Sequence, residues 1–282
     1  MTDAYYELID DATDLGEKFS ATDLVISTWS TSIQHAGPVS ALLVRALERC
    51  APRLDTRLSR VVVDLLGPVP VSDQLWVSSR LERAGKKIEL VNAELLALGP
   101  DGRHRSVARA SGWRLQQTDT KDLTPAPTLP MRPVSQARRQ DVARWDRNYL
   151  HSLDWRWLTD ILASPGEAWI KPTVDLVKGE TMTQLQQLFT VADNANGIGS
   201  KLAISQWRYL NNDLVVHLHR VPEGTGRACA QKPTTGPTVS PPMWARCSTN
   251  AGPLAASSSQ FCCGALINCD SWSCAELPVP GR

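Results

Sequence analysis

The chain has 282 residues, of which 42% are hydrophobic and 21% charged, and its formal net charge at pH 7 is +1. These values are typical of a soluble globular protein with one large core or two ordinary ones. The nearly neutral charge excludes a general electrostatic attraction to nucleic acid or to a membrane surface. No apolar run approaches the roughly 20 residues of a membrane-spanning helix. The first residues, MTDAYYELIDDATD, are acidic and lack a signal-peptide core, so we expect a cytoplasmic protein without a membrane span.

The first 116 residues follow one pattern of elements. Residues 1–20 are expected to form an edge strand or a leader, and residues 19–30 a first strand. The segment HAGPVSALLVRALERC then has apolar residues at helical spacing, and its Ala-Gly-Pro start suits the entry of a helix. A helix that starts beside a glycine also offers free N–H groups to an anion or a carbonyl oxygen. Turn residues then separate four predicted strands of an antiparallel meander, at residues 60–66, 74–82, 87–98 and 106–116.

The second half repeats this plan after a Pro- and Thr-rich linker at residues 117–144. Strands are predicted at residues 149–157 and 169–177, and Thr181 is the expected cap of the next helix. That helix ends at Asp193, because the Asn-Ala-Asn-Gly that follows tolerates the left-handed conformation of helix ends. A half-buried strand then begins near Asn211, where apolar residues alternate. Asp193 and Asn211 thus come from neighbouring elements and are expected to face one small space.

Several motifs resemble one family in both halves of the chain. In the second half these are AD-x-x-NG and NxDL-x-V-x-L-x-R-x-P-x-G, and in the first HAGP, D-LGPVPV, R-x-GKKI and ARASGWRL. They are similar to those of acyl-CoA thioesterases of the double-hotdog type. The resemblance implies an α+β fold in which two curved antiparallel sheets are each wrapped around a long helix. It places an N-terminal repeat at residues 1–116 and a C-terminal repeat at residues 145–224.

The last residues, 225–282, do not fit the repeat. They lack periodicity and contain six of the seven cysteines, with no Cys-x-x-Cys pair and no histidine beyond His219. A disulfide module or a metal site is therefore not expected. With permitted third bases, reading the codons one base earlier can turn AQKPTTGPTVS into AETNYGPDGV and ARCSTNAGPLAASSSQFCCG into AVFDERGPAGRIQQSVLLW. The second string alternates as strands do, so we infer a single-base frameshift near residues 224–228. The second repeat would then be incomplete and its tail irregular.

The resemblance implies an Asp, a Thr or Asn, and a Gln as the catalytic residues, all in the second repeat. Asp193 matches the Asp, and Asn211 falls where the Thr or Asn belongs. The Gln would lie in the shifted-frame QQS, whose codons overlap Ser257–Ser259, and is absent from the chain as written. A carboxylate can orient or deprotonate water, and amide or backbone donors can hold the developing oxyanion. The structural alternatives are that Asp193 is a solvated helix end and Asn211 a turn residue.

Three further residues are candidates for substrate binding. His35 and Gly37 stand at the start of the first helix, where they could orient a thioester carbonyl, although a structural role for His35 is favoured. Gly197, with Asn196, is a candidate that fits a helix end better than a ligand contact. His217 and His219 share one strand face, but with no evident third ligand they indicate a solvated face and no metal site.

The resemblance thus implies a protein that hydrolyses acyl-CoA to a fatty acid and coenzyme A, or one that is inactive with the tail as written. The resemblance implies no cofactor beyond the coenzyme A of the substrate, no nucleic-acid partner, and a homo-oligomer formed through sheet edges. Three alternatives stay open. One is a non-catalytic module that binds acyl-CoA or an acyl carrier, favoured by the missing Gln. The others are an inactive, misfolded gene product and a hotdog dehydratase, whose helix-opening catalytic pattern is not clear here.

Overall fold

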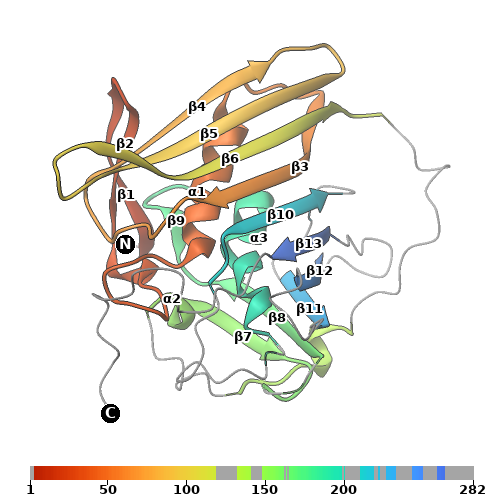
Figure 1. Cartoon of the computed structure of the whole chain (residues 1–282). Helices are drawn as coiled ribbons and strands as arrows, with labels where there is room; N and C mark the ends of the chain where they lie inside the picture. The colour runs from red at the N-terminus through yellow and green to blue at the C-terminus, as the bar shows by residue number, and fades with distance from the viewer. Residues whose placement is uncertain are drawn as a thin grey trace, which may run out of the picture.

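A computed structural model describes residues 3–118, 132–140, 148–161, 163, 165–198, 200, 210–218 and 222, and the backbone of three strands between residues 227 and 263. The first repeat is a six-stranded antiparallel sheet that curves around helix α1 (Ala36–Arg49) (Figure 1). Apolar side chains of α1 are buried because the sheet covers one side and a second helix the other. In sheet order, the strands are β1 (Ala4–Thr13), β2 (Gly16–Ala21), β4 (Leu75–Arg83), β5 (Ile88–Leu98), β6 (His104–Gln116) and β3 (Thr56–Leu65).

The second repeat has the same order around helix α3 (Gln184–Ala192). The two sheets join where β3 pairs with β10 in antiparallel register, with Val61 opposite Val216. Strand β9 (Asp175–Val177) leaves the second repeat and pairs in parallel with β1, so the sheets are also linked at that edge. In sheet order from the junction, the strands of this repeat are β10 (Asp213–Leu218), β13 (Ser259–Cys263), β12 (Met243–Thr249), β11 (Arg227–Lys232), β8 (Gly166–Pro172) and β7 (Leu153–Trp157).

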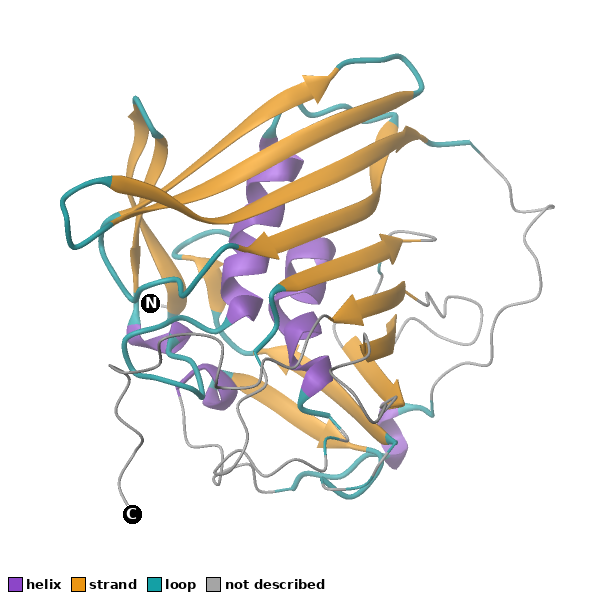
Figure 2. Ribbon diagram, viewed as in Figure 1, coloured by secondary structure: helices purple, strands orange, loops and turns teal. Residues whose placement is uncertain are grey.

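The two helices lie side by side and antiparallel inside the curved sheet (Figures 1 and 2). At one end, the hydroxyl of Thr183, which caps α3, donates to the carboxylate of Glu48 near the end of α1. At the other end, His35, which caps α1, meets Asp193 at the end of α3. This pairing brings the start of one repeat's helix to the end of the other's, which is where the predicted site residues lie.

The predicted helix and the four strands of the first repeat are confirmed to within a few residues, and so is the double-hotdog order. The first strand predicted at residues 19–30 is wrong. Strand β2 ends at Ala21, and Asp23–Val25 form a 3-10 turn. The turn forms because the hydroxyl of Thr22 accepts a hydrogen bond from the backbone N–H of Leu24. The N-terminal residues form a hairpin of two strands, of which β1 is the first.

Three details of the second repeat also differ from expectation. A short helix, α2 (Asn148–His151), precedes β7, and the strand predicted at residues 169–177 is divided into β8 and β9 after Pro172, which cannot donate to a ladder. The cap of α3 is Thr183 in place of Thr181, because Thr183 and Gln186 form a reciprocal capping box. Gly197 has φ of −84°, so the helix ends in a right-handed 3-10 turn, Asp193–Asn196, and not in a left-handed residue.

The sheet of the second repeat continues beyond residue 224, where the sequence placed its end. Strands β11, β12 and β13 pair with β8, with one another and with β10, and this completes six strands. Strands pair through hydrogen bonds between backbone groups, so these three strands can pair without alternating apolar and polar residues. The proposed frameshift concerns the gene and stays a prediction, and residues 264–282 lie outside the described part of the chain. In the linker, Arg138 forms an isolated antiparallel bridge with Trp157 of β7 through two backbone hydrogen bonds.

Candidate active site

Asp193 is the centre of a polar cluster between the two repeats. It is only 5% exposed, and each of its carboxylate oxygens has a partner. Oδ2 lies 3.0 Å from Nδ1 of His35, and Oδ1 accepts a hydrogen bond from the side-chain amide of Asn211. The predicted pair of Asp193 and Asn211 is therefore brought together, and His35 joins it from the other repeat.

The amide of Asn211 is oriented by a second amide. Nδ2 of Asn196 donates to Oδ1 of Asn211 over 3.1 Å, which leaves the Nδ2 end of Asn211 facing Asp193. The same Nδ2 also lies 3.3 Å from the backbone oxygen of Asp193. Asn211 thus holds both the helix end and the carboxylate in place.

The imidazole of His35 is held by stacking as well as by the acid. Its ring lies 3.9 Å from the ring of Tyr149 at an angle of 20°. The hydroxyl of Tyr149 donates to the backbone oxygen of Thr190 over 2.5 Å and accepts from Nδ2 of Asn194 over 2.7 Å. Burial lowers the pKa of His35, whereas the nearby Asp193 carboxylate raises it, and burial has the larger effect. A neutral imidazole is therefore favoured near pH 7.

Gly37 permits the close approach of the two helices. A Cβ on Gly37 would lie 2.2 Å from the backbone oxygen of Thr190 and 2.6 Å from the hydroxyl of Tyr149. Any other residue would push α1 away from α3. The distance between His35 and Asp193 therefore depends on this glycine.

Gly197 does not share this role. Its N–H donates to the backbone oxygen of Asn194 over 3.0 Å, within the 3-10 turn. The geometry thus gives its N–H to the turn and not to a ligand. Tyr149 and Asn194 belong to the cluster, although the sequence did not single them out as functional. Asn196, which the sequence placed at a helix end, belongs to it as well. The only signal for Asn194 was its position directly after Asp193.

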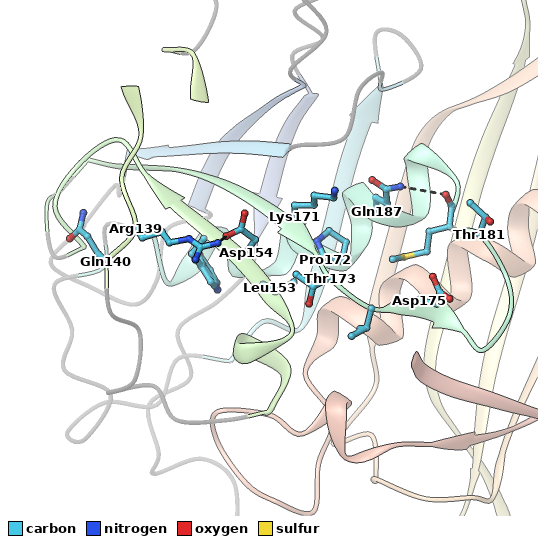
Figure 3. A pocket seen from close by; sticks show the side chains of 13 residues that line it. Arg139, Gln140, Leu153, Asp154, Lys171, Pro172, Thr173, Asp175, Thr181 and Gln187 are labelled. Carbon is cyan, nitrogen blue, oxygen red and sulfur yellow. Dashed lines mark hydrogen bonds and ion pairs between the residues drawn. The ribbon is translucent and has the colours of Figure 1, made fainter. Parts of the chain in front are cut away.

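A separate open groove of about 770 Å³ lies along β7, β8 and the first half of α3 (Figure 3). Its walls include apolar side chains such as Trp155 and Met182, together with Lys171 and the ion pair between Arg139 and Asp154. None of the predicted site residues lines it. Within the described ranges there is no group of three or more His, Cys, Asp or Glu residues that could hold a metal. Among those residues, no helix is long and apolar enough to cross a membrane.

Two family models match the chain. The acyl-CoA thioesterase N-terminal domain matches residues 25–115, and the acyl-CoA thioesterase C-terminal domain matches residues 120–236. A comparison of the sequence with curated proteins gave no match.

Several solved structures share the fold. A protein of unknown function with a hot dog fold from Alicyclobacillus acidocaldarius has a TM-score of 0.66 at 13% identity, covering 91% of this chain and 96% of its own. A candidate thioesterase II from Thermobifida fusca has a TM-score of 0.64 at 15% identity, with 92% and 95% covered. A candidate thioesterase from Novosphingobium aromaticivorans has a TM-score of 0.58 at 15% identity, with 92% and 98% covered. At these identities the likeness concerns the fold. With the two matching domain models, the chain belongs to the acyl-CoA thioesterase-like superfamily of double-hotdog proteins.

Proposed function

We propose that this protein hydrolyses acyl-CoA thioesters to a free carboxylic acid and coenzyme A. The observation that carries the proposal is the buried carboxylate of Asp193, held between the amide of Asn211 and the imidazole of His35 at the N-terminal end of α1. Membership of the family supports the substrate class.

The parts of the site match the needs of the reaction. Water must be activated before it attacks the thioester carbonyl, and a fixed carboxylate can orient that water. The negative charge that develops on the carbonyl oxygen needs donors already in place. The N-terminal end of α1 carries the positive end of the helix dipole, next to His35 and Gly37. A thioester carbonyl pointed at this end would have its carbon close to water bound at Asp193.

A second candidate is a module that binds acyl-CoA or an acyl carrier without turning it over. The observation in its favour is the absence of the Gln that the resemblance implies. The two functions differ in their response to ligand. A binding module would be stabilised thermally by acyl-CoA and release no thiol.

The test is thiol release from a panel of acyl-CoAs of increasing chain length, measured on this chain and on a version with the tail in the shifted frame. Release by either chain, lost in the matched Asp193→Asn variant, supports hydrolysis at this site. Release confined to the shifted-frame version supports the frameshift as well. Two folded chains that both bind acyl-CoA without releasing thiol would favour the binding module.

A further inference from the structure

We propose that His35 is the proton-transferring residue of the site, and that Asp193 acts by fixing its imidazole with the proton on Nδ1 and the lone pair on Nε2. The inference rests on the proposed hydrolysis and goes beyond it. In the sequence, the favoured role of His35 was structural, and its link to Asp193 was not foreseen. The structure supplies that link across the two repeats.

The contacts of Nδ1 decide the position of the proton. Nδ1 lies 3.0 Å from Oδ2 of Asp193 and 3.2 Å from the backbone N of Gly37. It cannot accept from the Gly37 N–H and donate to Asp193 at the same time. A hydrogen bond to a charged group is stronger than one between two neutral groups. Nδ1 therefore carries the proton and donates it to Asp193, and Nε2 keeps its lone pair.

This arrangement has a consequence for Gly37. Its N–H faces an Nδ1 that carries a proton and so cannot serve as its acceptor. The N–H thus needs another acceptor at the start of α1, and the carbonyl oxygen of a thioester is a suitable one. One tautomer of His35 therefore provides a base and leaves a donor for the oxyanion.

The surroundings of the imidazole suit a base that is neutral near pH 7. Burial holds the pKa of His35 below its ordinary value, and the nearby charge that opposes this is Asp193. Tyr149 covers the ring, and its hydroxyl donates to the backbone oxygen of Thr190 and accepts from Asn194. Both oxygens of Asp193 already have donors, from His35 and Asn211, which favours the imidazole over the carboxylate as the proton acceptor.

The proton balance closes with these groups alone. Nε2 takes a proton from water as the water oxygen bonds to the thioester carbonyl carbon. The tetrahedral intermediate then expels the coenzyme A sulfur as the C–S bond breaks. The imidazolium returns the proton to that thiolate. The net change is one thioester and one water converted to one carboxylic acid and one thiol.

The test is His35→Asn in the full chain, with His217→Asn as the matched control on an exposed position of β10. Asparagine is favoured at a helix N-cap and its amide can take the place of Nδ1 beside Asp193, but it has no Nε2. We expect kcat for thiol release to fall about 10²- to 10⁴-fold, as for loss of a general base. The melting temperature should change little. In the wild type, kcat should fall with decreasing pH only below pH 6.5, because burial lowers the pKa of the His35 imidazole. This fall should be absent in His35→Asn. Added imidazole should restore part of the rate in His35→Ala.

Nitrogen-15 spectra of the histidines provide a readout that is independent of activity. The expected wild-type signal for His35 is a protonated Nδ1 and a bare Nε2, and Asp193→Asn should alter it. A bare Nδ1 in the wild type would overturn the inference even if the enzyme is active. Thiol release that is retained in folded His35→Asn would overturn the inference alone and leave the proposed function standing. A wild type that binds acyl-CoA but releases no thiol would overturn the proposed function, and the base role with it.

Discussion

Arg45 in α1 and Asp193 directly after α3 occupy equivalent places: each is ten residues beyond the N-cap of its helix, His35 and Thr183 respectively. Because the helices lie antiparallel, these places are at opposite ends of the pair. Arg45 is fully buried and binds the carboxylates of Glu17 and Glu180. The end that contains Asp193 therefore holds the groups proposed for acid–base chemistry, whereas the end that contains Arg45 is occupied by an ion-pair network. Among the residues that the structure describes, the two equivalent places thus differ, and the one beside His35 is the candidate site.

Asp193→Asn should reduce kcat/KM for thiol release at least about 10²-fold, because the amide cannot orient the base or the water as a carboxylate does. The Nδ2 group of the new asparagine would also face another hydrogen-bond donor, either the amide of Asn211 or Nδ1 of His35. The matched control is Asp64→Asn, on an exposed position of β3. Equal rates in the two folded variants would remove Asp193 from the mechanism.

Asn211→Ala should lower kcat about 10-fold or more, by analogy with the loss of a polar group that positions charge. The alanine removes the donor to Asp193 and leaves the amide of Asn196 without this acceptor. The neighbouring Asn212 is exposed, so Asn212→Ala is the control and should keep the wild-type rate. If both variants behave alike in steady-state kinetics, Asn211 is only a turn residue.

Gly37→Ala should destabilise the protein by about 1–3 kcal/mol, the usual cost of overpacking. The added Cβ would lie 2.2 Å from the backbone oxygen of Thr190, so α1 must shift and the contact between His35 and Asp193 must lengthen. Urea unfolding and thiol release should therefore both decline. Gly67→Ala is the control, because nothing lies within 4 Å of its added Cβ. A fully active and stable Gly37→Ala would show that the close helix approach is not needed.

Arg45→Met should lower the free energy of unfolding by about 3–5 kcal/mol at pH 7, as when one partner of a buried ion pair is removed. Arg49→Met is the control, because Arg49 is 53% exposed and pairs with the same two glutamates. It should cost at most about 1 kcal/mol. Similar losses in both variants, measured by urea titration, would contradict the account of the buried network.

The same network predicts how stability depends on pH. Hydrogen bonds from Arg45 lower the pKa of Glu180 below its ordinary value. A carboxylate with a lowered pKa stabilises the fold above its unfolded pKa, and this contribution is lost as the pH falls through the folded value. The melting temperature of the wild type should therefore fall in the acid range below about pH 4.3. Arg45→Met should show less of this fall, and an unchanged profile would argue against the pairing.

The sequence predicted the parts of the fold that depend on local patterns. The helix after His35 and the strands of the first repeat have clear periodicities, and the repeat order identified the double hotdog. The position of Asp193 followed from the end of a helical run. By contrast, residue type alone does not decide between Thr181 and Thr183 as the cap of α3. Thr183 is the cap because it forms reciprocal hydrogen bonds with Gln186. Strands β11 to β13 have no side-chain pattern to predict them, because they are held by backbone pairing.

The link between His35 and Asp193 could not be predicted from local sequence at all. It depends on the antiparallel packing of two helices from different repeats, and that packing depends on Gly37 and on Tyr149. The glycine was noted for its free N–H, whereas its structural importance is its lack of a side chain. Tyr149 lies in a stretch predicted as a strand, and only its place in α2 puts its ring over the imidazole.

The proposed function depends on the carboxylate of Asp193, which is held between the two repeats. The most direct measurement is thiol release from a panel of acyl-CoAs by the full chain and its shifted-frame version, each beside its Asp193→Asn variant. We expect turnover in at least one parent chain and a loss of about 10²-fold or more in its variant. Turnover that is unaffected by Asp193→Asn, or folded parents that bind acyl-CoA without turnover, would contradict it.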